Sequence, residues 1–401
     1  MIGLRLTHKD SSITKFFWNG FYLFECINLF VALILDLVNM VLTVTDGSFI
    51  DLVTMMPCVG YTILCIVKSC KLFFHQPVYE RLISELRDMW PRCAVTREEH
   101  DVVRTAITKL KFTVKGYYYC NVALFFIFVS PPFVAIIKRA TGLETPLRLS
   151  FSYWFPFDPF QHGHFEVIAV IQMWHCFVTL CFMLATDLLF CVFISHITTQ
   201  FDLLAIKIKR MFYVPLDDQL IGTYPLANYN MNSKHDIEPD GNNELEKKYE
   251  MLLVEIILSH RTLIRLSRDV EQQFTFALLI NFINGSIIIC FCGYCSVFVE
   301  KWNEFNYKIF LITATLQIWI FCSYGQKLLD SSEGIADAVY CCGWYNAPQR
   351  IKRSLIIILY RAQRQVCITT YGFSVISMAS YSTILKTSWS YLMLLVNVFE
   401  Q

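Results

Sequence analysis

Seven apolar runs divide this chain of 401 residues, and each is long enough to cross a lipid bilayer as an α-helix. A spanning helix needs about 17–25 mostly apolar residues, and a chain inside lipid must satisfy its own backbone hydrogen bonds. The runs cover residues 20–42, 49–74, 116–137, 165–194, 274–299, 307–328 and 367–398. The pattern predicts an all-α membrane protein, with one seven-helix domain that takes up residues 1–401.

The composition agrees with a chain that lipid solvates. Hydrophobic residues make up 55% of it and charged residues 17%, whereas soluble domains carry about 25% charged residues. Most of the 16 cysteines lie inside the apolar runs, where cysteine behaves as a small hydrophobe. Cys292 and Cys295 lack the further ligands that a zinc site needs. The net charge of +1 indicates no nucleic-acid partner. Residues 1–19 are polar, so we expect no cleaved signal peptide.

The distribution of Lys and Arg predicts the orientation of the seven helices. If the N-terminus is cytosolic, the inner segments 1–19, 75–115, 195–273 and 329–366 hold 25 of these residues and the outer segments hold 5. Basic residues concentrate in cytosolic loops. We therefore expect a cytosolic N-terminus and an extracellular C-terminus. This orientation excludes the G-protein-coupled receptors, whose seven helices run the opposite way.

The inner segments are long and periodic, which predicts helices beneath the membrane. Apolar residues at helical spacing occupy 78–89, which Pro91 ends, and 103–114, which leads into the third span. Residues 214–243 are rich in Asn, Asp, Pro and Gly, a composition typical of a flexible loop. Residues 245–270 then keep a heptad spacing. That heptad face either covers the chain's own bundle or contacts another subunit.

The sequence contains no HExxH, GxSxG, P-loop or GxGxxG pattern, so we expect neither an enzyme nor a cofactor. His162 and His164 lie in an outer loop, where an aromatic lid is a better interpretation than a metal site. His175 and Asp187 lie inside the fourth span, where ionisable groups are functional candidates by default. They are more than three helical turns apart and do not form one site.

Three stretches of the sequence, together covering nearly the whole chain in order, resemble the insect odorant receptor family. The first reads Trp-Phe-Pro-Phe-Asp in the outer loop, the second surrounds the end of the sixth run, and the third lies in the last run. They are residues 154–158 with Glu166, residues 324–333 with 344–346 and 361–364, and residues 381–391. The chain length and the inverted topology agree with that resemblance.

The resemblance implies a ligand-gated, non-selective cation channel in which four subunits surround a central pore. The last helix would line the pore, and the cytosolic helices with the first part of the seventh run would form a helical anchor region. The family's shared co-receptor has a longer second inner loop than residues 195–273 provide, so the chain resembles a tuning receptor. The implied partners are a small volatile odorant, the co-receptor subunit and membrane lipid, at the plasma membrane of a sensory neuron.

The resemblance also implies an odorant pocket in the outer half of the second, third, fourth and sixth spans. There we expect aromatic walls with a few hydrogen-bonding groups, as in other small-molecule pockets. The candidate ligand-binding residues are Cys58, Tyr61, Thr62, Phe126, Val129, Ile171, Gln172, His175, Thr313 and Thr315. The alternative for several of them is ordinary packing between helices.

The end of the last run carries the candidate pore residues. Leu394, Asn397 and Val398 are spaced i, i+3 and i+4, so they share one helix face. Aligning the motif around Tyr391 with the family places the pore on this face. An apolar constriction can block ions by dewetting, which suits Leu394 and Val398 as a gate, while Asn397 offers a neutral amide to a cation. The alternative is that this face packs on a neighbouring helix.

Two other functions stay open on the sequence. A gustatory receptor shares the topology and the assembly, but its usual ending of Thr-Tyr, five residues and Gln-Phe is only partly matched after Ser390. A secondary transporter usually contains internal repeats, and this sequence shows none. Ligand-evoked current without coupled uptake of a substrate distinguishes a channel from a transporter.

Overall fold

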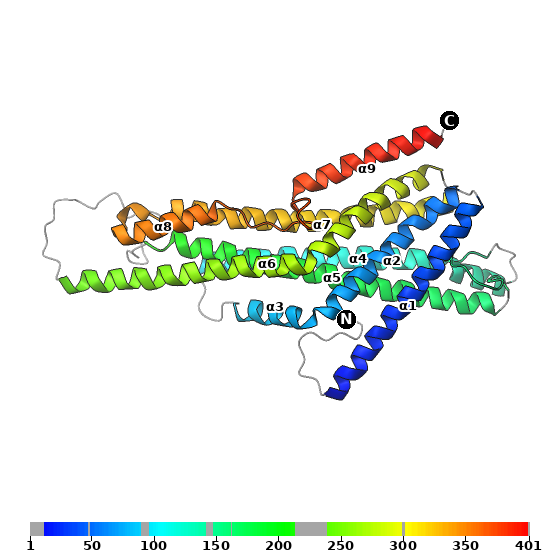
Figure 1. Cartoon of the computed structure of the whole chain (residues 1–401), viewed down its shortest axis with the longest axis horizontal. Helices are drawn as coiled ribbons and strands as arrows, with labels where there is room; N and C mark the ends of the chain where they lie inside the picture. The colour runs from blue at the N-terminus through cyan, green and yellow to red at the C-terminus, as the bar shows by residue number, and fades with distance from the viewer. Residues whose placement is uncertain are drawn as a thin grey trace.

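The structure is a computed structural model that describes residues 12–46, 49–89, 96–141, 147–161, 163–212, 239–298 and 301–399. In this part of the chain, long α-helices run side by side as one elongated bundle (Figure 1). They are α1 (Ser12–Thr45), α2 (Phe49–Phe74), α3 (Gln76–Asp88), α4 (Arg97–Ala140), α5 (His164–Lys209), α6 (Pro239–Phe298), α7 (Lys301–Tyr340), α8 (Gln349–Ala362) and α9 (Met378–Phe399), with a 3-10 turn η2 (Trp344–Asn346).

Six of these helices, α1, α2 and α4 to α7, are long and apolar enough to cross a membrane. They contain the first six predicted spans almost entirely. With 22 residues, α9 is also long enough to span. It is not among the six, and Lys386 and several Ser and Thr residues interrupt its sequence.

The seventh predicted span, residues 367–398, is wrong at its beginning. The helix starts at Met378, and residues 363–377 form a folded segment that is not helical. Its turn requires positive φ angles of 54° at Tyr371 and 80° at Gly372. An α-helix does not contain such angles, and glycine adopts them without strain. Gly372 and Lys386 interrupt this run and indicated two helices, but the structure contains one helix, and the part before it is not helical.

Hydrogen bonds and a close backbone approach hold this folded segment against the bundle. The Glu271 carboxylate of α6 accepts from the backbone N–H of Thr369 at 3.0 Å and from its hydroxyl at 2.6 Å. On α7, a Cβ atom at Gly325 would lie 2.4 Å from the carbonyl oxygen of Ile376. Only glycine leaves room for that approach, which gives part of the 324–333 motif a structural reason.

The helices α4 to α7 continue beyond the predicted spans and form the inner end of the bundle, the end predicted to be cytosolic. α3 confirms the helix expected over residues 78–89, and α8 packs against α7 at the same end (Figure 1). α6 already begins at Pro239, so residues 239–243 of the predicted flexible loop 214–243 are helical. The rest of that loop lies outside the described residues.

The heptad face of residues 245–270 points into the chain's own bundle. Ile256, Leu263, Leu266 and Val270 are all buried in the main hydrophobic core. From Ile256 to Val270 this face therefore packs within the chain's own bundle and is not free for a subunit contact. Tyr249 and Leu252 pack against the same core but are only partly buried.

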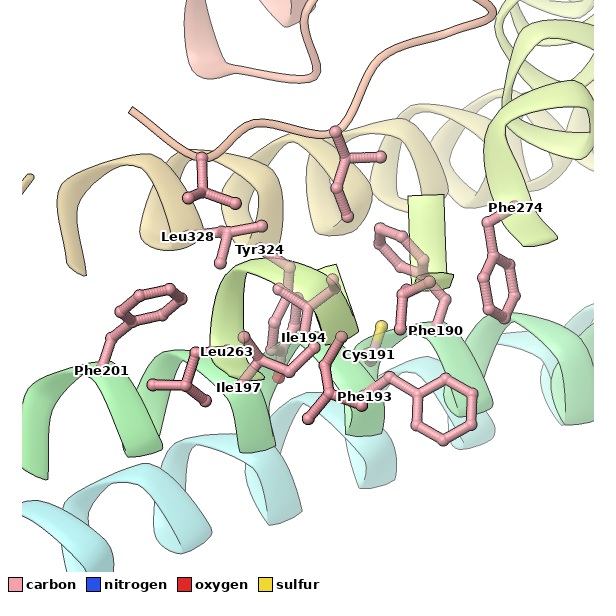
Figure 2. Close-up of a cluster of buried hydrophobic side chains, with 14 of the residues drawn as sticks. Phe190, Cys191, Phe193, Ile194, Ile197, Phe201, Leu263, Phe274, Tyr324 and Leu328 are labelled. Atoms are coloured by element: carbon pink, nitrogen blue, oxygen red, sulfur yellow. The ribbon is translucent and has the colours of Figure 1, made fainter. Parts of the chain in front are cut away.

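The main core lies where α5, α6 and α7 pack together, and Figure 2 shows its side chains converging from these helices. The ring centroid of Phe190 lies 5.3 Å from that of Phe274 and 5.2 Å from that of Phe321, both edge-on. Leu263 and Leu328 are fully buried in the same cluster. α5 carries buried residues along its whole length, as expected of a helix at the centre of a bundle.

Candidate ligand-binding cavity

A cavity of about 70 Å³ lies between α1, α2, α4, α5, α7 and the loop that follows α4. Most of its lining is aromatic or aliphatic, and a few side chains add hydrogen-bonding groups, which is the usual make-up of a small-molecule site. The lining residues are Leu29, Ala32, Cys58, Tyr61, Thr62, Asn121, Leu124, Phe125, Phe128, Phe151, Tyr153, His175, Cys176, Thr179, Leu180 and Phe310.

Three aromatic rings form one rigid wall of the cavity. The ring centroid of Phe310 lies 5.6 Å from that of Tyr61 and 5.7 Å from that of Phe128, and both pairs meet edge-on. Edge-on contacts fix the relative orientation of aromatic rings. On α4, Asn121, Leu124 and Phe128 recur at helical spacing, so one face of that helix supplies this side of the cavity.

The loop between α4 and α5 lies against the cavity and is fastened by Gln172 of α5. The Gln172 Oε1 accepts from the backbone N–H groups of Ser150 at 3.1 Å and Phe151 at 3.2 Å. Its Nε2 donates to the Phe151 carbonyl at 2.7 Å. From α1, the Asn39 amide donates to the Ser152 carbonyl at 2.7 Å. These bonds fix the loop backbone at the height of the cavity.

His175 joins this loop to α1 at the cavity wall. Its Nε2 lies 2.9 Å from the Asn28 Oδ1, and its Nδ1 lies 3.3 Å from the Tyr153 hydroxyl. An amide oxygen can only accept, so Nε2 carries the proton and the Tyr153 hydroxyl donates to Nδ1. Burial raises the pKa of Tyr153 well above its ordinary value, and the nearby Asp36 carboxylate raises it further. The hydroxyl therefore keeps the proton that it donates.

Four of the ten predicted pocket residues line the cavity, namely Cys58, Tyr61, Thr62 and His175. His175 is hydrogen-bonded, as expected of a neutral histidine inside a span. Gln172 is buried beside the cavity and holds the loop instead of lining the space. Its role was not visible in the sequence because the loop backbone supplies all its partners.

The other five predicted pocket residues do not line the cavity. Phe126 and Ile171 point outward, with 64% and 48% of their surface exposed. Each residue turns about 100° around a helix axis, so a small error in helix rotation exchanges an inward for an outward position. Val129 and Thr313 are buried between helices. The hydroxyls of Thr313 and Thr315 bond to carbonyls of their own helix, α7.

The walls that α1 and the outer loop contribute to the cavity were not predicted from the sequence. Leu29 and Ala32 belong to α1, which was not expected to reach the pocket, and Phe151 and Tyr153 belong to the loop. One signal could have indicated the loop: every second residue over 151–157 is aromatic. Extended chains send alternate side chains to the same side.

A second polar cluster surrounds Asp187 nearer the inner end of the predicted spans. Its carboxylate pairs with the Lys68 ammonium of α2. It also accepts from the Tyr117 hydroxyl of α4 at 2.8 Å and from the Gln317 amide of α7 at 2.6 Å. All four side chains are buried. The partners come from three other helices, all of which also line the cavity, so spacing along α5 alone could not identify them.

α9 lies along the outside of the bundle (Figure 1). One of its faces packs on α6, where a Cβ atom at Gly293 would lie 2.9 Å from a methyl carbon of Leu392. Leu394 and Asn397, two of the predicted pore residues, lie on the opposite face and are exposed. Val398 belongs to the same helix, but its side chain lies outside the described residues.

Comparison with known proteins relates the chain to olfactory receptors. It is 22% identical over 396 residues to Odorant receptor 85b of Drosophila melanogaster, covering 98% of this chain and 94% of that protein. It is 24% identical to Odorant receptor 67c of the same species, with coverage of 98% and 92%. Its fold is similar to that of the olfactory receptor OR5 of Machilis hrabei, solved in complex with eugenol. The TM-score is 0.81 at 16% identity, over 99% of this chain and 94% of that one.

The family model for the seven-transmembrane odorant receptors matches residues 48–389, which is most of the chain. A member of this family has seven transmembrane helices, so α9 is the seventh, after the six that hydropathy identifies. The first six spans occur in the predicted order, and the match includes the first two stretches that carried the sequence resemblance and residues 381–389 of the third. The chain therefore belongs to the seven-transmembrane odorant receptor family, and it is a multi-pass membrane receptor and not an enzyme.

Proposed function

We propose that this chain is the odorant-sensing subunit of an odorant-gated, non-selective cation channel in the plasma membrane of sensory neurons. The cavity between the spanning helices is the observation that carries this proposal. It is apolar, it is framed by aromatic rings, and it offers few hydrogen-bonding groups. Such a site suits a small, mostly apolar volatile. The similar fold of OR5, solved in complex with eugenol, supports the same reading.

The cavity supplies both halves of odorant recognition. Tyr61 and the rings around it contact the apolar part of the odorant, and Cys58 and Thr62 lie on the same helix beside them. Tyr153 and His175 form the polar side, where a hydroxyl or carbonyl group of the odorant finds hydrogen-bonding partners. The preferred ligand is therefore a small volatile with one oxygen-bearing group.

α9 lines the pore in this proposal. Thr383, Thr387, Ser390, Leu394 and Asn397 follow one another at spacings of four and three residues, so they share one face of the helix. All five are exposed in the single chain. A mostly polar face on a spanning helix suits an aqueous pore when four copies surround one axis, and the apolar residues near its outer end suit a hydrophobic gate.

The inner end of the bundle provides the contact with a co-receptor subunit. Met251, Val254 and Leu258 form an exposed stripe on α6, which we name the α6 stripe. On α8, Ile356 and Ile357 are exposed as well. Exposed apolar patches on a surface in water mark interaction sites. The proposed occupant is the shared co-receptor of this family, because the chain resembles a tuning receptor.

The test is to record current at fixed voltage from cells that express the chain with and without a co-receptor. A panel of small oxygen-bearing volatiles, with eugenol included, serves as the set of ligands. We expect current from at least one panel member only when both subunits are present. Full current from the chain alone rejects the need for a co-receptor. Accumulation of a panel compound in the cells without ligand-evoked current rejects the channel.

A further inference from the structure

The cavity has one wall that is not helical. Residues 150–157 of the outer loop, which we name the outer strap, contribute Phe151 and Tyr153 to its lining. The strap contains no helix or strand. The remaining lining residues belong to five helices that pack directly against one another. The strap is thus the wall with the least packing behind it.

Individual hydrogen bonds attach the strap to its neighbours. Gln172 makes three bonds to its backbone, and Asn39 makes one. The backbone N–H of Trp154 donates to the carbonyl of Leu35 on α1 at 3.3 Å. The Tyr153 hydroxyl bonds to His175. A segment held by a few individual bonds, without a helical backbone of its own, opens at lower cost than a packed helix.

A continuous row of aromatic rings leads along the strap from the cavity to the outer surface. The ring centroid of Phe151 lies 6.1 Å from Phe128 in the cavity wall and 5.9 Å from Tyr153. Tyr153 lies 6.4 Å from Phe155, which lies 5.5 Å from Phe157. The side chain at the far end, Phe157, is 46% exposed. An apolar molecule can follow this row from outside to the cavity.

The size of the cavity shows that a wall must move. Its volume is about 70 Å³, whereas a cavity known to bind benzene measures about 150 Å³. A ring-bearing volatile therefore does not fit while every wall stays in place. Among the walls, the strap combines the weakest attachment with the aromatic row that reaches the surface.

We propose that the outer strap controls access to the cavity: it moves away from α5 to admit odorants from the outer side. The hydrogen bond between Tyr153 and His175 stabilises the closed position of the strap. Once that bond opens, both groups become available to the odorant, so Tyr153 also determines which odorants are held. The inference rests on the proposed function, because it assigns the access route of the proposed odorant site.

Two native cysteines allow a test that needs no known odorant. Cys58 and Cys176 both line the cavity, and the small neutral reagent methyl methanethiosulfonate labels thiols that it can reach. The full-length chain in cell membranes is incubated with this reagent, and labelling of each cysteine is followed by mass spectrometry. Cys341 is exposed at the inner end, far from the strap, and reports the reagent dose.

A reversible engineered disulfide, used as a lock, then holds the outer strap in its closed position. The backbones of Leu35 and Trp154 are joined by a hydrogen bond, and a disulfide spans Cα atoms about 4.4–6.8 Å apart. In the Leu35→Cys/Trp154→Cys variant, oxidation should slow labelling of Cys58 and Cys176 by more than about tenfold. Reduction, followed by removal of the reductant, should restore it. Asn39→Cys/Ser152→Cys serves as a second lock, and the single cysteine variants are the controls.

Removing the Tyr153 hydroxyl should have the opposite effect on labelling. Tyr153→Phe keeps the ring and removes the hydroxyl, so Cys58 and Cys176 should be labelled about two- to tenfold faster, the factor expected for one lost hydrogen bond. Equal labelling in the locked and reduced variants overturns the proposal and indicates access from the bilayer. Absence of labelling in the unlocked chain overturns it as well. Neither result depends on odorant current, so the proposed function is judged separately.

Discussion

Asp187 and Lys68 place a complete ion pair inside the membrane-spanning part of the bundle. A single charge in that position is costly, and the pair is tolerated because Tyr117 and Gln317 satisfy the remaining acceptor positions of the carboxylate. Only one arrangement of α2, α4, α5 and α7 brings the four groups together. The cluster therefore defines how the helices below the cavity are aligned.

Replacing Asp187 by Asn is expected to lower the free energy of unfolding by about 3–5 kcal/mol, because Lys68 then stays buried without a counter-charge. Replacing Lys68 by Met in the same chain removes that charge and should recover most of the loss. Thermal unfolding of the detergent-solubilised full-length chain measures both variants. A double variant no more stable than Asp187→Asn alone would show that the ion pair is not the source of the loss.

Phe125 and Phe126 form a matched pair for the cavity. Phe125 lines it, whereas Phe126 is exposed on the outside of the bundle. Phe125→Ala should shift the half-maximal concentration of an active panel odorant by about tenfold, the factor for a lost aromatic contact of about 1.4 kcal/mol. Phe126→Ala should leave it unchanged. The measurement is the dose–response of the current with the co-receptor present, and equal shifts would contradict the assignment of the cavity.

The same pair shows what the sequence can and cannot predict about the position of a single residue. The depth of a residue in the membrane follows from its place in an apolar run, which is why Cys58, Tyr61 and Thr62 were predicted at the depth of the cavity that they line. The rotation of the helix about its axis does not follow from the run, because an apolar side chain suits both lipid and core. Phe126 was therefore predicted as a pocket residue, whereas its neighbour Phe125 is the one that lines the cavity.

At the scale of the helices, hydropathy predicted those elements whose length the bilayer itself determines. The six spans in α1, α2 and α4 to α7 were predicted correctly for that reason. The start of α9 was not, because the turn at Gly372 depends on backbone angles and on contacts with Glu271. The periodicity of residues 245–270 predicted a helix with one apolar face but could not decide what covers that face.

α6 offers a test that separates its two apolar faces. Leu266 is fully buried, and Leu258 in the α6 stripe is 56% exposed. Leu266→Ala should cost about 2–5 kcal/mol of stability because it leaves a cavity in the core. Leu258→Ala should change the stability of the isolated chain by less than about 0.5 kcal/mol, yet reduce the amount of co-receptor that co-purifies with it. Unchanged co-purification would remove the α6 stripe from the proposed subunit contact.

For the whole molecule, one feature is unexplained by a single chain: a polar row on the outer surface of a membrane-spanning bundle. The inner segments are rich in Lys and Arg, which predicts the cytosolic side. Among the spanning helices, α9 presents a mostly polar row to the outside of the bundle, from Thr383 to Asn397. Lipid is a poor environment for such a row. Further subunits around the same axis would enclose it in water, and the pore proposal follows from that requirement.

The pore prediction concerns the outer end of this row. Asn397→Asp would place a carboxylate there in each copy of the chain, and rings of carboxylates attract cations. We expect stronger block or higher permeation by divalent cations. The size of this effect is reduced by the co-receptor subunits, which keep their own residues.

Leu394→Ala should raise the current without odorant, because a smaller apolar side chain weakens dewetting of the pore. Leu392→Ala, on the face that packs against α6, is the matched control and should leave selectivity unchanged. If current without odorant, divalent permeability and block all stay at wild-type values in Leu394→Ala and Asn397→Asp, this face of α9 does not line the pore.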